Sequence, residues 1–114
     1  MIEKICYDYL SGALSAPVYT TIPSPLPNRF YLIEKVGGSE TDKIPSAAVA
    51  LQSYGSSLFD SAAMNLAGIK AMLSMVELDA VSAVSLNSDY NYTDTARKRN
   101  RYQAVFNITY FEEE

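Results

Sequence analysis

Residues 102–110 alternate strictly between two sets of side chains, and this pattern constrains the fold more than any other feature of the sequence. In an extended strand one face would carry Tyr102, Ala104, Phe106, Ile108 and Tyr110, and the other would carry Gln103, Val105, Asn107 and Thr109. Successive side chains of a strand point to opposite faces of a sheet. We therefore expect a sheet with one covered face and one partly hydrated face.

Four further segments are rich in apolar, aromatic or β-branched residues over strand-like lengths: residues 18–20, 30–36, 47–54 and 81–86. Gly37 and Gly38 end the second of them, where we expect a tight turn with positive φ. Residues 39–45 are then expected to form a polar loop. The third segment lies between Pro45 and Gly55, and so short a stretch between two helix breakers favours a strand.

Two segments have the spacing of amphipathic helices. From Ile2 to Leu14, apolar residues recur every three or four positions, and Pro17 ends the pattern. The second helix is expected to begin near Ser56 or Ser57, since either is a good N-cap. Its predicted buried face carries Phe59, Ala62, Ala63, Leu66, Ile69, Lys70 and Leu73. Met64, Met72 and Met75 are expected to fill gaps in the core.

The connections between these segments are also visible in the sequence. Prolines at positions 23, 25 and 27 exclude a helix and a central strand, so we expect an extended surface connector there. A second polar loop is predicted from Asn87 to Asn100. The resulting order is helix, short strand, strand, strand, helix, strand, strand. It predicts one α+β domain over residues 1–114, with a mixed, mostly antiparallel sheet of four to five strands and two helices packed on one face.

The residue types restrict the chemistry. The chain has no histidine, which removes histidine general-base catalysis, histidine-activated nucleophiles and histidine metal ligands. Its single cysteine, Cys6, cannot form an internal disulfide and is expected to be a small core residue. We therefore expect no catalytic residue, cofactor or metal site, and no enzyme.

Charge and hydropathy restrict the location and the partners. A net charge of −4 argues against a general nucleic-acid-binding protein. No run of about 18 apolar residues indicates a membrane span, and the first residues do not have the layout of a signal peptide. A soluble protein of a reducing cytosol fits these features.

Two loops hold the candidate contact residues. In the loop from Gly37 to Ile44 they are Gly37, Gly38, Glu40 and Asp42, and in and after the loop from Asn87 to Asn100 they are Arg97, Lys98, Arg99 and Arg101. The basic run has two readings, a solvated loop or an electrostatic contact with an acidic surface or nearby DNA. Both loops are long and polar and lie between strands, so we expect them to make contacts with other copies of the chain or with a partner.

Several landmarks follow one another in a particular order. In the first half they are a helix ending at Ala16-Pro17-Val18-Tyr19, a proline-marked connector into Pro27-Asn28-Arg29-Phe30, and Tyr31-Leu32-Ile33-Glu34-Lys35 closed by Gly37-Gly38. Then come a loop with Asp42, a strand with Val49, Leu51 and Gln52, Ser56-Ser57 before an alanine-rich helix, and Arg101-Tyr102-Gln103 at the start of the last strand. This order resembles the tail terminator family of long-tailed (siphovirus-like) bacteriophages and related prophages, over roughly residues 1–111. The chain departs from common members by lacking Trp after the third strand, near Tyr54.

The resemblance implies a structural virion protein that is made in the bacterial host cytoplasm and located in the tail. It would form a ring of its own copies, usually a hexamer, on the last ring of the tail-tube protein. There it would stop tail polymerisation and form the surface for a head-connector or head-completion protein. DNA would pass through the ring without specific binding. The alternatives are a head-completion or connector protein of the head–tail joint, a small-molecule-binding α+β domain, and a nucleic-acid-binding module.

Overall fold

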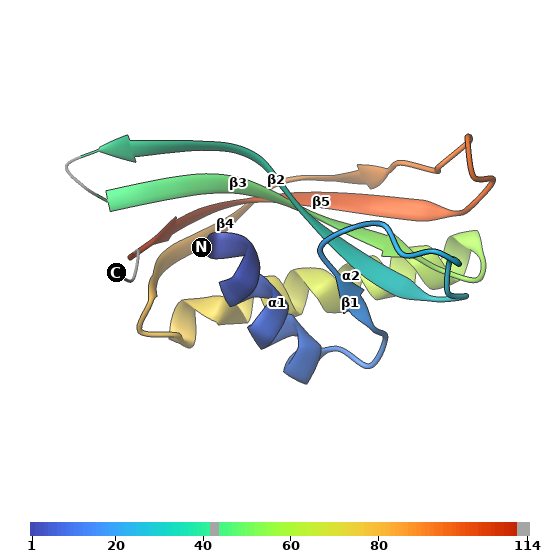
Figure 1. Cartoon of the computed structure of the whole chain (residues 1–114), viewed down its shortest axis with the longest axis horizontal. Coiled ribbons are helices and arrows are strands. Elements are labelled where there is room, and N and C mark those ends of the chain that lie inside the picture. The colour runs from blue at the N-terminus through green and yellow to red at the C-terminus, as the bar shows by residue number, and fades with distance from the viewer. Residues whose placement is uncertain (42–43, 112–114) are drawn as a thin grey trace.

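The computed structural model describes residues 1–41 and 44–111, and it consists of one five-stranded sheet with two helices (Figure 1). The helices are α1 (Ile2–Ala13) and α2 (Leu58–Ser74), and a 3-10 helix, η1 (Met75–Glu77), follows α2. The strands are β1 (Val18–Tyr19), β2 (Phe30–Thr41), β3 (Ile44–Tyr54), β4 (Val81–Asn91) and β5 (Arg101–Tyr110). The predicted order of helices and strands is confirmed.

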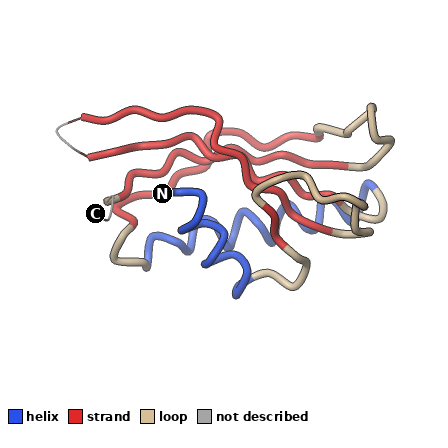
Figure 2. Tube along the Cα trace, viewed as in Figure 1, coloured by secondary structure: helices blue, strands red, loops and turns tan. Residues whose placement is uncertain are grey.

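The strand order across the sheet is β1-β2-β3-β5-β4. β1 is parallel to β2, and the other neighbouring pairs are antiparallel. Figure 2 shows both helices on the same side of the sheet. The predicted α+β class, with a mixed and mostly antiparallel sheet covered on one face, is therefore confirmed.

The main core lies between the helices and the covered face of the sheet. The alternation in β5 has the expected result, since Ala104, Phe106 and Ile108 are fully buried and Asn107 is exposed. From the helices, the core receives Ile2, Cys6, Leu10, Met64 and Met72. Cys6 is fully buried in this core, as predicted, and its burial raises the pKa of the thiol to about 12.

A smaller core lies on the other face of the sheet, at one end only. The rings of Phe30 and Tyr54 are stacked there, with centroids 4.3 Å apart, and both side chains are fully buried. Leu32, Tyr19 and Leu26 pack around them. Leu26 belongs to the proline-marked connector, which forms neither helix nor strand between residues 20 and 29. The face predicted to be partly hydrated is thus covered at this end.

The predicted buried face of α2 is wrong for most of its residues, although Ile69 packs against the main core. The buried residues are Ser61, Met64, Asn65, Gly68 and Met72, whereas Phe59 is 85% exposed and Leu66 is 63% exposed. Gly68 explains part of why this side of the helix faces the sheet, because a Cβ atom at this position would lie 2.6 Å from Cδ2 of Leu51 in β3. The helix therefore lies close to the sheet at Gly68, with Met64 and Met72 in the core, while Phe59 and Leu66 face outward.

The predicted turn at Gly37 and Gly38 is also wrong. β2 continues through both glycines, each is paired with β3, and no glycine among the described residues has a positive φ. A register shift between Lys35 and Gly37 accommodates them in the ladder. Of the loop expected at residues 39–45, the described part is strand, and Asp42 lies outside the described residues.

The second predicted loop is shorter than expected. β4 extends to Asn91, so residues 87–91 are strand and only residues 92–100 connect β4 to β5. Pairing with β5 up to Tyr102 keeps this polar stretch extended.

None of the helices in the described part of the chain has both the length and the apolar character that a membrane span requires.

Two glycine substitutions test how closely α2 packs: Gly55 lies against the start of α2, and Gly12 in α1 is a comparison site with open space around it. A Cβ atom on Gly55 would lie 2.4 Å from the backbone nitrogen of Ser61, so Gly55→Ala should lower the free energy of unfolding by about 2–3 kcal/mol. Gly12 in α1 has nothing within 4 Å of the same atom, so Gly12→Ala should raise it by about 0.5–1 kcal/mol. Urea denaturation measures both, and equal stability of Gly55→Ala and the parent chain would contradict the close approach.

Candidate functional site

Three loops meet at one end of the sheet, which we call the loop end (Figure 2). They are the connector of residues 20–29, the junction of residues 55–57 between β3 and α2, and the turn of residues 92–100. The Arg99 guanidinium donates a hydrogen bond to the backbone oxygen of Asn28 over 2.6 Å. The backbone N–H of Gly55 donates to the oxygen of Asn100 over 3.3 Å. These bonds join the three loops into one surface.

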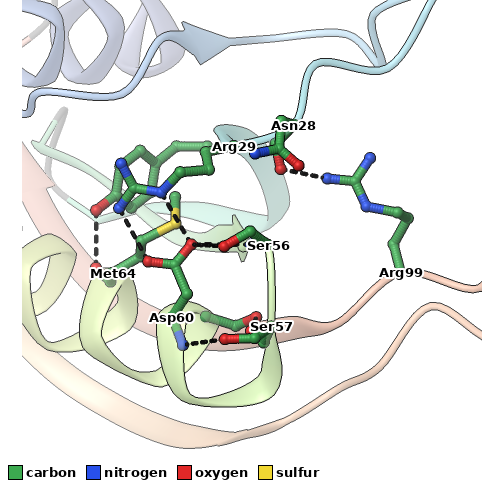
Figure 3. Close-up of polar contacts among 9 residues, drawn as sticks. Asn28, Arg29, Ser56, Ser57, Asp60, Met64 and Arg99 are labelled. Atoms are coloured by element: carbon green, nitrogen blue, oxygen red, sulfur yellow. Dashed lines mark hydrogen bonds and ion pairs between the residues drawn. The ribbon is translucent and has the colours of Figure 1, made fainter.

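The connector is attached to the start of α2 by an ion pair, drawn in Figure 3. Nε and Nη2 of Arg29 donate to the two carboxylate oxygens of Asp60, over 2.8 and 3.0 Å. The backbone N–H and the hydroxyl of Ser56 donate to the same carboxylate. Ser57 is the N-cap, because its Oγ accepts a hydrogen bond from the backbone N–H of Asp60. The hydrogen bonds from Arg29 and Ser56 lower the pKa of Asp60 to about 2.

A second polar network lies in the turn of residues 92–100. The buried carboxylate of Asp94 accepts hydrogen bonds from the backbone and side chain of Arg97 and from the hydroxyl of Tyr54. Burial would raise the pKa of Asp94, but these hydrogen bonds and the charge of Arg101 outweigh it and lower the pKa below its usual value. The Arg101 guanidinium stacks on the ring of Tyr92, 4.2 Å from its centroid, and donates to the Tyr54 hydroxyl.

A row of amides continues this network across the helix-free face of the sheet. Nε2 of Gln52 in β3 donates to Oε1 of Gln103 in β5 over 2.8 Å, and Gln103 donates to the hydroxyl of Tyr90 in β4. Both glutamines are buried and bonded, so they hold three strands in register. The sequence placed Gln103 on the polar face of its strand, but only the register of β3 against β5 shows that Gln52 lies opposite it.

The helix-free face is hollowed beside these networks. The hollow has a volume of about 700 Å³, and its lining includes Leu32, Glu34, Gln52, Tyr92, Arg97 and Arg101. Its two arginines already contact Asp94, and Gln52 is bonded to Gln103. The hollow therefore offers a polar surface whose strongest groups are already bonded within the molecule. Within the described residues, no group of three or more Asp, Glu or Cys side chains could hold a metal ion.

The structure separates the two predicted contact loops. Gly37, Gly38 and Glu40 lie in β2 near its pairing with the start of β3, whereas Phe30 at the other end of β2 lies at the loop end. Asp42 is outside the described residues. The basic run is therefore not brought together with the glycines.

The basic run itself is mostly engaged within the molecule. Arg97 forms an ion pair with Asp94, Arg99 bonds the connector, and Arg101 is inserted between aromatic rings. Lys98 is exposed and has a φ of 56°, in the left-handed region. The basic residues thus build the loop end, and Lys98 is the member that projects from it into solvent.

No protein-family model matches the sequence, and no curated protein is significantly similar to it. The function must therefore be inferred from the surfaces of the chain and from the order of its sequence landmarks.

The buried network around Asp94 gives a stability prediction. Asp94→Asn removes the charge that faces Arg97 and Arg101, and it should lower the free energy of unfolding by about 2–4 kcal/mol, because the arginines lose a buried partner. Asp8→Asn is the matched control, since Asp8 pairs with Lys4 on an exposed helix surface and its loss should change little. Equal effects of the two substitutions in urea denaturation would count against the network.

The low pKa of Asp60 gives a pH prediction. An aspartate in the unfolded chain has a pKa of about 3.9, so the folded value near 2 stabilises the protein fully above about pH 5. That contribution is lost as the pH falls from about 4 to 2. The melting temperature of Asp60→Asn should therefore be below that of the parent chain at pH 7 and approach it near pH 2. In an Arg29→Gln background most of this pH-dependent difference in melting temperature should disappear. If it persists there, the pH dependence does not come from the ion pair of Arg29 with Asp60.

Proposed function

We propose that the chain is a structural subunit of a bacteriophage tail, a terminator that caps the head-proximal end of the tail tube. In this role, copies of the chain form a ring on the last ring of the tail-tube protein, stop tail polymerisation and provide the surface to which the head attaches. The protein acts by contact and carries out no reaction.

The observation that carries the proposal is that the sheet has two open and different edges. At one edge lies β4, with 11 residues. At the other edge β1 pairs only with Tyr31 and Leu32, so no strand among the described residues covers β2 from Ile33 onward. Open edges present unpaired backbone groups to a partner. Two different surfaces on opposite flanks are what a head-to-tail contact needs, and such contacts form a ring when the rotation from one copy to the next closes.

The order of the sequence landmarks supports a phage tail as the assembly in which the chain has this role. The proline-marked connector, the segment that carries Gly37-Gly38, the serine-capped helix and the final alternating strand follow one another in an order that resembles tail terminators. The loop end and the β2–β3 hairpin lie at opposite ends of the sheet (Figure 1). In a ring joined at the sheet edges, these two ends are available to the tail-tube protein and to the head connector. The net charge of −4 suits a ring through which DNA passes without binding.

A small-molecule-binding domain is a second candidate, and the hollow of about 700 Å³ on the helix-free face favours it. Thermal-shift screening with polar metabolites distinguishes the two. A ligand that raises the melting temperature, and loses this effect in Glu34→Gln, would support the binding domain. No shift across the screen is the result expected for a tail subunit.

Electron microscopy of lysates from a phage that lacks this gene tests the proposal. The expected result is filled heads beside detached tails of abnormal, extended length, because tube growth has lost its stop. Expression of the parent chain in the host should restore normal particles. Tails of normal length beside leaking or empty heads would move the protein to the head side of the joint. Intact infectious particles would overturn both structural roles.

A further inference from the structure

The two outermost long strands of the sheet run in opposite directions, which suits them to each other. The strands β2, β3, β5 and β4 are antiparallel to one another in this order, so β4 runs opposite to β2. A second copy placed beside the first in the same orientation therefore brings its β4 antiparallel to β2. Antiparallel strands pair directly through their backbones. Addition of a strand to an open sheet edge is a common mode of protein recognition.

The end of β1 determines where such pairing can begin. β1 is paired with Tyr31 and Leu32, so no described strand covers β2 from Ile33 to Thr41. Residues 32–36 also line the large hollow of the helix-free face, so this part of the edge borders open space. β4 ends at Asn91, and the longest possible overlap therefore places Asn91 of the neighbour opposite Ile33.

The backbone of β2 presents hydrogen-bonding groups at this edge. The N–H of Tyr31 donates to the oxygen of Pro17 on the β1 side, over 2.8 Å. In an antiparallel ladder every second residue directs both its N–H and its C=O to the same side. The backbones of Ile33 and Lys35 therefore face the open edge.

The backbone of β4 has the matching phase. The N–H of Tyr92 donates to the oxygen of Arg101 in β5, over 2.9 Å. The residues that alternate with Tyr92, Asn91 and Asp89, therefore direct their N–H and C=O groups away from β5. In the register above, each of these two residues lies opposite a residue of β2 whose backbone also faces the edge. Both pairs can therefore exchange hydrogen bonds.

The two strands also carry bulges at matching positions. The ladder of β2 with β3 skips Val36, and the ladder of β4 with β5 skips Asn87. In the register above, these two residues lie one position apart. A bulge bends a strand and commonly protects an edge from pairing. Two bulges at the same place bend both strands alike, so they exclude other partners and permit this one. Another shift in β4, at Ser82, lies beyond the overlap.

On the helix-covered face, the register brings opposite charges together. Lys35 is the single cation of β2, and it has no ion-pair partner among the described residues. It alternates with Ile33 of the main core, so it projects to the face that carries the helices. Asp89 is the single charged residue of β4, and its Oδ1 accepts from Asn65 of α2 on the same face. Its Oδ2 can accept from the ammonium of Lys35 opposite.

On the helix-free face, the register places Tyr90 of the neighbour opposite Glu34. Tyr90 is 41% exposed and its oxygen accepts from Gln103, so its own O–H can donate to the carboxylate of Glu34. Glu40, the remaining charge of β2, lies opposite Val84. No like charges of the two strands therefore face each other.

The overall charge of the two flanks does not select this pairing. Glu77 and Asp79 precede β4, and Glu3 of α1 lines the hollow beside β2, so both flanks carry acidic groups. The selection comes from the backbone phase, the matching bulges and the two side-chain pairs.

We infer that β4 of one copy of this chain pairs antiparallel with the open edge of β2 in the next copy, with Asp89 opposite Lys35 and Tyr90 opposite Glu34. The inference rests on the proposed ring and deepens it, because it names the strands that join the subunits and their register. The sheet of one subunit then continues into the sheet of the next.

A charge exchange tests the pairing, with sedimentation of the purified chain at concentrations up to roughly 1 mM. The parent chain should associate. Lys35→Asp and Asp89→Lys each place like charges opposite one another, so each alone should raise the dissociation constant at least about tenfold. In an equal mixture every contact between unlike variants has opposite charges again, and association should return to the parental level.

Lys98→Asp is the matched control for the charge exchange, because it makes the same change on the exposed loop end and should associate normally. Circular dichroism checks that each variant is folded. A monomeric parent chain, or a mixture that associates no better than its two components, would overturn the inference.

Disulfide cross-linking tests the register independently of charge. The Cα atoms of Glu34 and Tyr90 should lie about 4.5 Å apart, within disulfide range. Glu34→Cys mixed with Tyr90→Cys should therefore give a covalent dimer under mild oxidation, which a reductant removes. Glu34→Cys mixed with Ser88→Cys is the control, since its pair is displaced by two residues and should cross-link poorly. The native Cys6 is fully buried. Equal yields from the two mixtures, or no dimer from the first, would overturn the register.

These measurements use the purified protein and need no phage, so they fail separately from the proposed function. Register-specific association in a chain whose loss leaves infectious particles intact would reject the tail role and keep the interface. Extended tails in its absence, together with normal association of Lys35→Asp, would keep the tail role and reject the interface.

Discussion

The close approach of α2 to the sheet determines which side chains of this helix are buried and which it exposes to a partner. Small residues make this approach possible, with Gly55 against Ser61 at the start of the helix and Gly68 against Leu51 in its middle. Because these positions face inward, the larger side chains of Phe59 and Leu66 face outward. One contact therefore builds the core and leaves an apolar stripe exposed.

The rest of the molecule follows from having one sheet and two helices. The helices cover one face, and at the loop end the connector and the turn of residues 92–100 cover the other face over Phe30 and Tyr54. The arginines that looked like a binding surface hold these loops in place, through Asp94, Asn28 and the aromatic rings. The surfaces that stay available are the open sheet edges, the hollow of the helix-free face and the exposed side chains of α2, and the proposed ring would use the sheet edges.

Much of the fold could be predicted from local patterns, and the errors have a common cause. The alternation of β5, the stripe of α1 and the serine cap of α2 depend on residues near one another in the sequence. The path of β2 through Gly37 and Gly38 depends on pairing with β3, which local patterns do not contain. In α2 the more apolar face is mostly exposed, and the buried face is the one that carries Gly68, which fits closely against Leu51. At the site, the ion pair of Arg29 with Asp60 joins residues 31 positions apart, so no local signal could reveal it.

We propose that copies of this chain form a ring on the end of a phage tail tube, joined at the open edges of the sheet. A cryo-electron microscopy reconstruction of the head-proximal end of the tail tests this proposal most directly. The predicted result is a ring of copies in which β4 of each lies at the boundary with its neighbour. A ring in which both sheet edges face solvent in every copy, or a tail end without this protein, would contradict it.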